Sequence, residues 1–192
     1  MDRIYLDHIS GKPVDERVLK DIVKIHTQNF ANPSSVHSFS EEARRAIEES
    51  RSNIAKFVNA EKEDRIIYTS GATESNNLAI KGVAFRNKAK GDHIITSSIE
   101  HMSVINTIKY LGREGFKTTF LPVDKYGIVD TKRLEKEINE KTILVSIMYA
   151  NGEIGSIQPI KEMKNIISIL ILLMLSLAMK SSVLMVLLLI NS

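Results

Sequence analysis

The chain has 192 residues, a length that suits one domain or one domain with an added segment. Its 26 basic and 23 acidic residues are interspersed, and the net charge of +3 gives no basic surface of the kind that binds nucleic acid. The absence of cysteine excludes a disulfide framework, a thiolate metal site and a cysteine nucleophile, and no metal site is expected.

The first 60 residues are predicted to form a helical segment that flanks the main domain. Apolar residues spaced three and four apart indicate a first helix around residues 18–25 and a second one that reaches Phe57. Ser38 and Glu41 have the spacing of a capping box, so the second helix is expected to begin close to Ser38. A turn-rich loop, residues 32–37, precedes it.

Residues 61–163 alternate between short apolar runs and amphipathic segments. Strands are predicted at 65–69, 93–97, 117–121 and 142–148, and helices at 74–87, 102–114 and 131–139. Strands separated by helices of this length form crossover units. The predicted fold class is therefore α/β, with a mainly parallel sheet that helices cover on both faces.

Three segments follow predicted strands, at Gly71, His101 and Asn151. Ligands of parallel sheets bind beyond the carboxyl ends of the strands, so we expect these segments to converge on one rim. The turn 69–73, with sequence TSGAT, leads into a helix. A helix start presents free N–H groups and a partial positive charge, which suit a phosphate. The alternative is an ordinary turn in which Ser and Thr only cap the helix.

Five blocks occur in one order along the chain. They are YLDHISGKPVDERVL (5–19), NPSSVHSFSEEAR (32–44), IIYTSGATESNNLAIKG (66–82), SSIEHMSV (97–104) and ILVSIMYANGEIGSIQPI (143–160). Together they resemble the cysteine desulfurases, pyridoxal-phosphate-dependent enzymes among the class V aminotransferase-like proteins. The resemblance covers residues 4–162 and implies the large domain of a fold-type I pyridoxal-phosphate-dependent transferase, in incomplete form.

The resemblance also implies the site residues. The N–H groups of Ala72 and Thr73, with the Thr73 hydroxyl, would hold the cofactor phosphate. His101 would stack on the pyridine ring and assist proton transfer, two tasks that suit a flat group titrating near neutrality. The alternative for a lone histidine is a structural or surface role. Loop 32–37 would lie near the active-site mouth, or serve only as the loop before the second helix.

The sequence departs from the family pattern in several places. Gly152 stands where a second asparagine would contact the phenolic oxygen of the cofactor. Asn151 could partly replace it, although a role as a turn former is the favoured interpretation. Ser40 replaces a usual glycine, and His8–Lys12 differs from the usual block. These changes leave the substrate open.

Residues 164–192 form a divergent apolar tail, in which only Lys180 is charged after residue 165. The uncharged run 166–179 is shorter than the ~20 residues of a membrane span, and a longer span would place Lys180 near its middle. The family has its cofactor-binding lysine in this region, and Lys180 lacks the Ser-His that precedes that lysine. We therefore expect a lost reading frame or a truncation. A membrane anchor and an unusual buried segment are the alternatives.

The leading hypothesis is a cysteine desulfurase-like enzyme that removes sulfur, or an amino group, from a small amino acid such as L-cysteine to give alanine. The resemblance implies pyridoxal 5'-phosphate, a homodimer and a sulfur-acceptor protein, as in iron–sulfur cluster assembly. This chain is expected to be inactive alone, because it has no cysteine and no family lysine. Its charged first residues lack a signal-peptide core, so a cytoplasmic protein is expected.

Two other functions stay open from the sequence. One is a non-catalytic binding or interaction protein that keeps the phosphate corner and uses its apolar tail as an anchor. The other is a nucleotide-binding α/β domain, although no G-x-G-x-x-G or Walker-type pattern supports it.

Overall fold

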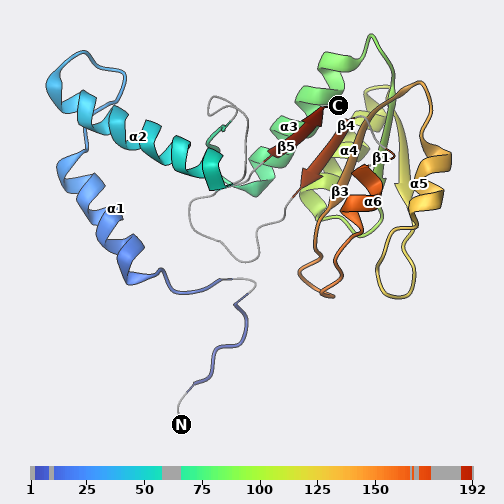
Figure 1. Cartoon of the computed structure of the whole chain (residues 1–192), viewed down its shortest axis with the longest axis horizontal. Helices are drawn as coiled ribbons and strands as arrows, with labels where there is room; N and C mark the ends of the chain where they lie inside the picture. Colours follow the sequence, from blue (N-terminus) through green and yellow to red (C-terminus); the bar gives the residue numbers. More distant parts are fainter. Residues whose placement is uncertain are drawn as a thin grey trace. The chain divides into compact units, whose positions relative to one another are not determined.

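The computed structural model describes residues 3–8, 11–57, 66–164, 166, 169–173 and 187–191 (Figure 1). The chain divides into a helical unit that ends at Ile67 and an α/β unit that begins at Tyr68. The predicted boundary lies at residues 60 and 61, a few residues earlier. Each unit is described by itself.

The helical unit contains the two predicted helices, α1 (Glu16–Gln28) and α2 (Ser38–Phe57). The Asp15 carboxylate caps α1 by accepting the Arg17 N–H at 2.9 Å. No residue of α1 is buried, and its apolar residues are exposed. The predicted capping box does not form. The Glu41 carboxylate instead forms an ion pair with Arg45 at 2.5 Å. Charge pairing one turn along the helix competes with capping for that carboxylate.

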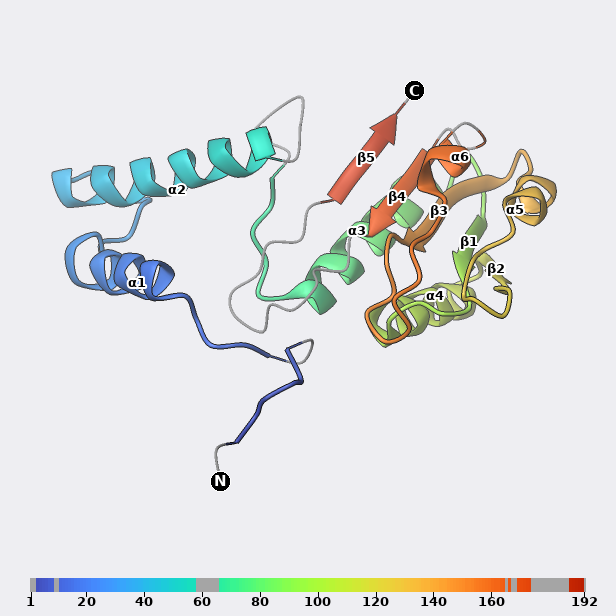
Figure 2. The same ribbon diagram turned by 60° about the horizontal axis from the view of Figure 1, so that its bottom comes forward.

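Within the described residues, the α/β unit holds a five-stranded sheet. Its strands are β1 (His93–Ser97), β2 (Lys117–Leu121), β3 (Thr142–Met148), β4 (Ile169–Leu173) and β5 (Leu187–Asn191). The order is β2-β1-β3-β4-β5, and the first four strands run parallel. β5 lies antiparallel beside β4 (Figure 2). The mainly parallel sheet is confirmed, and β1 to β3 have the predicted bounds.

The predicted strand at 65–69 is wrong over residues 66–69, which form no strand. Apolar spacing reports burial, whereas a strand also needs a neighbour with which to exchange hydrogen bonds. Ile66 is buried and Ile67 is exposed, so the alternation is present. The carbonyl of Ile66 accepts a hydrogen bond from the Arg51 guanidinium, a side chain. The segment therefore has the pattern of a strand without a place in the sheet.

Helices cover both faces of the sheet, as predicted. They are α3 (Ala72–Asn87), α4 (Met102–Arg113), α5 (Thr131–Glu137) and the short α6 (Ile160–Lys164). Neighbouring residues of β1 point to opposite faces. Ile94 packs with Ile80 of α3 and Ile108 of α4, whereas Ile95 packs with Leu134 of α5 and Met163 of α6. All five residues of β1 are buried, as in a strand covered on both sides.

His93 links β1, β2 and β3. It is the first residue of β1, so it lies at the amino end of the strands, opposite the predicted rim. Its Nδ1 lies 2.8 Å from Thr142 Oγ1 on β3, and its Nε2 lies 2.9 Å from Thr119 Oγ1 on β2. Burial lowers the pKa of His93 below the ordinary value of about 6.5, and the nearby cation of Lys117 adds to this. The carboxylates of Glu137 and Asp92 oppose the shift without reversing it.

We predict that His93 makes the α/β unit less stable in acid. His93 binds a proton more readily in the unfolded chain than in the folded chain. Its contribution to stability is therefore fully present above about pH 6.5 and is lost as the pH drops below that value. Urea unfolding followed by circular dichroism at pH 5.5 and 7.5 would measure the loss. From pH 5.5 to 7.5 the free energy of unfolding should rise less, or fall more, in H93N than in the unmodified chain, whereas H26Q, on exposed α1, should behave as the unmodified chain does. An equal difference in H93N and the unmodified chain would contradict this account.

Candidate active site

The first turn of α3 presents backbone N–H groups that the helix itself does not use. Gly71 is the N-cap and has no side chain to cap the helix, and the first intrahelical bond runs from Ser75 N–H to the Gly71 carbonyl at 3.0 Å. The N–H groups of Ala72 and Thr73 precede that bond and have no partner inside the helix. They carry the positive end of a 16-residue helix dipole.

The hydroxyl groups before α3 form hydrogen bonds elsewhere. Thr69 Oγ1 donates to the Gly71 carbonyl at 3.2 Å and lies 2.5 Å from Ser75 Oγ. Ser70 donates from its N–H and its Oγ to the Glu74 carboxylate at 2.6 and 2.5 Å. These two bonds lower the pKa of Glu74. Neither Thr69 nor Ser70 caps a free N–H group of α3, and the anion site at this turn stays a prediction.

His101 is the N-cap of α4 and follows β1 by four residues. Its Nδ1 accepts the Ser103 N–H at 3.1 Å and lies 2.8 Å from Ser103 Oγ. The side chain is exposed. The ring is therefore anchored at one nitrogen while its other edge remains accessible.

A buried hydrogen bond joins the start of α3 to the start of α4. Asn76 Nδ2 donates to Ser103 Oγ at 2.6 Å, and both residues are buried. Asn76 lies one helical turn, about 6 Å along the axis, from Ala72. The structure thus brings the free N–H groups of α3 and the His101 ring to the same end of the α/β unit.

Asn151 ties the segment after β3 to the segment after β1. Its Nδ2 donates to the Ile99 carbonyl at 3.2 Å, and its Oδ1 accepts the N–H groups of Glu153 and Ile154 at 2.9 and 3.1 Å. These are the contacts of a turn former, the role that the sequence favours. All three predicted segments therefore lie at the carboxyl end of the sheet, and Asn151 uses its amide to hold the rim together.

Sequence analysis missed Glu100, the residue before His101. Its Oε1 accepts from Ser97 Oγ at 2.6 Å and from the Met148 N–H at 2.7 Å, so it bridges the ends of β1 and β3. Its Oε2 is buried and has no hydrogen-bond partner among the described residues. Burial raises the pKa of Glu100 to about 7, although the hydrogen bonds from Ser97 and Met148 act in the opposite direction. A lone acid three residues after a buried strand was the available signal.

We predict that Glu100 makes the fold less stable as the pH rises. Its folded pKa is about 7 and its ordinary value is about 4.3, so its contribution is fully present below the lower value and is lost between the two. E100Q keeps the carbonyl oxygen for Ser97 and Met148 and removes the ionisation. It should be more stable than the unmodified chain at pH 8, by roughly 1–3 kcal/mol.

Urea unfolding of E100Q and the unmodified chain at pH 5 and 8 would test this. The exposed Glu114 offers a matched control, and E114Q should keep the pH dependence of the unmodified chain. His93 changes stability in the opposite direction over this pH range. The free energy of unfolding of each variant is therefore compared with that of the unmodified chain at the same pH. An unchanged pH dependence in E100Q would show that Glu100 ionises as freely in the folded chain as in the unfolded one.

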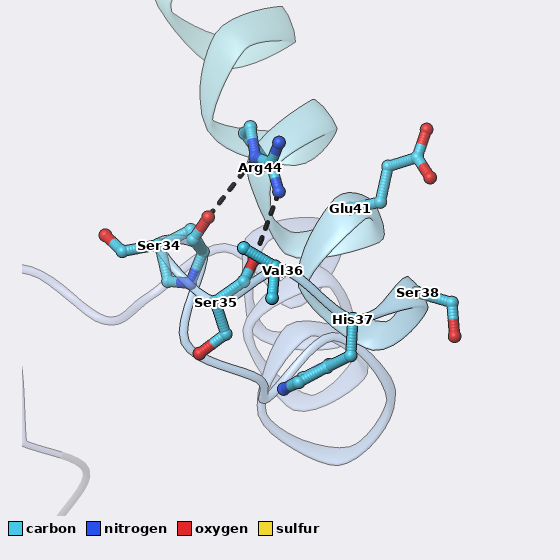
Figure 3. A pocket seen from close by; sticks show the side chains of 8 residues that line it. Ser34, Ser35, Val36, His37, Ser38, Glu41 and Arg44 are labelled. Atoms are coloured by element: carbon cyan, nitrogen blue, oxygen red, sulfur yellow. Dashed lines mark hydrogen bonds between the residues drawn. The ribbon is translucent and has the colours of Figure 1, made fainter.

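Loop 32–37 belongs to the helical unit and lines a hollow of about 690 Å³ (Figure 3). Arg44 of α2 holds the loop by donating to the carbonyls of Pro33 and Ser35 at 3.2 and 3.3 Å. Ser40 Oγ, at the position of the usual glycine, lies 3.2 Å from His37 Nδ1. The expected position of the loop near the active-site mouth stays a prediction, because it concerns the α/β unit as well.

The remaining expectations concern the tail, the membrane and metal ions. Lys180 and most of the tail lie outside the described residues, although 169–173 and 187–191 form β4 and β5. None of the helices that the structure describes is both long and apolar enough to span a membrane. Within the same residues, no three His, Asp or Glu side chains are grouped to hold a metal ion.

The chain matches a known family along most of its length. Residues 4–174 match aminotransferase class-V. A cysteine desulfurase, IscS 1, of Archaeoglobus fulgidus is 56% identical over 164 residues, which are 85% of this chain and 43% of that protein. The cysteine desulfurase IscS of Dictyoglomus turgidum is 50% identical over 163 residues, 85% of this chain and 41% of its own length.

Solved structures give the same result for the fold. A NifS-like protein has a TM-score of 0.88 at 36% identity, and the match covers 91% of this chain and 50% of that one. A structure described as SspA in complex with cysteine has a TM-score of 0.79 at 40% identity, with 84% and 46% covered. The chain thus spans about two-fifths of the length of these curated relatives, and half or less of the two solved chains.

Proposed function

Since the chain belongs to the aminotransferase class-V family, we propose that it supplies the phosphate-binding corner of a pyridoxal-phosphate-dependent cysteine desulfurase. Members of this family are pyridoxal phosphate enzymes. The observation that supports the proposal is the uncapped first turn of α3 at the same end of the α/β unit as the anchored ring of His101. A helix start with free N–H groups and a flat aromatic group at one end of the unit suit a phosphorylated aromatic cofactor.

The proposed roles follow from the geometry of each group. The N–H groups of Ala72 and Thr73, with the Thr73 hydroxyl, bind the phosphate at the positive end of α3. His101 lies against the pyridine ring. Asn151 is not needed as a direct ligand, because its amide is engaged by Ile99, Glu153 and Ile154, and it acts by ordering the loop after β3.

The bound cofactor would supply an electron sink for bonds broken at the amino-acid substrate. The residues of this chain bind and orient that group. Among the described residues, no lysine forms a hydrogen bond or an ion pair with His101 or with the start of α3. We therefore assign this chain cofactor binding and orientation, and leave the covalent anchor unassigned.

For the whole protein, we propose removal of sulfur from a small amino acid such as L-cysteine, to give alanine. The relatives described above are cysteine desulfurases, and one structure holds cysteine. A homodimer, a sulfur-acceptor protein and a cytoplasmic location belong to the same proposal. The alternative of a non-catalytic binding protein with an apolar anchor finds no support among these relatives.

Proline at position 72 would test the phosphate corner directly. A72P removes one free N–H, yet proline suits the first helical position because that N–H has no partner inside the helix. We expect A72P to weaken pyridoxal phosphate binding about tenfold or more, because a hydrogen bond to a charged group is worth roughly 1.5–3 kcal/mol. Equilibrium dialysis of the 192-residue chain with pyridoxal phosphate would measure the change.

A72G is the matched control, because it keeps the N–H and changes the same position. It should bind the cofactor within about twofold of the unmodified chain, apart from the small helix-propensity cost of glycine. Circular dichroism should show the same helix content in both variants. Equal cofactor affinity of A72P and A72G would rule out the Ala72 N–H as a phosphate donor.

A further inference from the structure

We propose that Asn76 and Ser103 are positioning residues that hold His101 in the tautomer with its proton on Nε2. Three hydrogen bonds support this assignment. Asn76 Nδ2 donates to Ser103 Oγ at 2.6 Å, Ser103 Oγ lies 2.8 Å from His101 Nδ1, and the Ser103 N–H donates to the same Nδ1 at 3.1 Å. The role of His101 at the cofactor rests on the proposed function, whereas the tautomer rests on these contacts alone.

The backbone bond fixes the direction of the chain of contacts. Ser103 N–H can only donate, so His101 Nδ1 must offer a lone pair and cannot carry a proton. A neutral imidazole has one proton on its two ring nitrogens, which places that proton on Nε2. The Nε2–H group is then the donor that the ring offers to a ligand.

The Asn76 amide determines where the Ser103 hydroxyl proton goes. Because Nδ2 donates to Ser103 Oγ, a lone pair of that oxygen is used and its proton is directed to His101 Nδ1. The opposite orientation of the amide would present Oδ1 to Ser103 and compete with His101 for the same proton. In the recorded orientation, Asn76 Oδ1 is buried without a partner among the described residues. The bond to Ser103 thus satisfies the Nδ2 group of the amide and leaves Oδ1 unsatisfied.

The consequence concerns what His101 can do. In this tautomer the ring has no basic nitrogen facing outward, because Nδ1 receives two hydrogen bonds from Ser103. His101 therefore contributes a flat surface and an N–H donor, and it does not take up a proton at Nε2. This refines the expectation that the histidine assists proton transfer.

Nitrogen-15 NMR of the histidine rings would test the assignment in the 192-residue chain without cofactor. The chain has five histidines, so a spectrum of H101Q identifies the signals of His101. At a pH where the ring is neutral, we expect Nε2 to show a bonded proton and Nδ1 to show the shift of a hydrogen-bonded acceptor. S103A should move the Nδ1 signal toward that of a free acceptor nitrogen, and S103T should restore it because it keeps the hydroxyl.

N76D tests the direction of the relay. Aspartate has the shape of asparagine but accepts the Ser103 proton, so this variant should move the His101 Nδ1 signal in the same sense as S103A. If N76D does not fold, S103A and S103T carry the test. T107A is the matched control, because Thr107 Oγ1 bonds the Ser103 carbonyl at 2.7 Å one turn further along α4, and it should leave the ring signals unchanged.

The outcomes are distinguishable from those of the cofactor experiment. An Nδ1 signal that stays the same in S103A, or in the folded Asn76 variant, overturns the inference, as does a proton on Nδ1 in the unmodified chain. Failure of the unmodified chain to bind pyridoxal phosphate contradicts the proposed function and leaves the tautomer result as it stands. Where binding occurs, S103A should weaken it by roughly threefold to tenfold and S103T should not.

Discussion

A single buried carboxyl group, that of Glu100, holds together the ends of the two central strands on which the candidate site is built. It accepts from Ser97 at the end of β1 and from the Met148 N–H at the end of β3. His101 follows Glu100 directly, and Asn151 follows Met148 by three residues and returns a hydrogen bond to Ile99. The position of the rim therefore depends on a contact between strands, and the burial that raises the pKa of Glu100 is the cost of that contact.

The sequence predicted the parts of the fold that periodicity controls. β1, β2 and β3 have the predicted bounds because short strand segments alternate with amphipathic helices, a pattern that specifies crossover units. β1 and β3 are buried almost throughout, whereas in β2 only Leu121 is buried. The segment 65–69 has a similar apolar pattern, but residues 66–69 form no strand. Local spacing describes which side chains are buried, whereas membership of a sheet depends on a partner elsewhere in the chain.

The candidate site was predictable in position but not in its supporting contacts. The segments at His101 and Asn151 could be placed on one rim because each follows a parallel strand, whereas the turn at Gly71 was placed there by a strand that residues 66–69 do not form. Asn76 and Ser103 are 27 positions apart, and no spacing rule connects them. The resemblance to a known family likewise points to His101 without giving its tautomer, which depends on the direction of hydrogen bonds that only coordinates contain.

The central claim is that the free N–H groups at the start of α3 bind the cofactor phosphate. Amide NMR of the 192-residue chain tests this claim most directly. Titration with pyridoxal phosphate and, separately, with inorganic phosphate should shift the Ala72 and Thr73 amide signals in a saturable way. Pyridoxal, which lacks the phosphate, should leave those two signals in place. Binding of pyridoxal phosphate that moves neither amide, or equal shifts with pyridoxal, would contradict the assignment of the phosphate to this helix start.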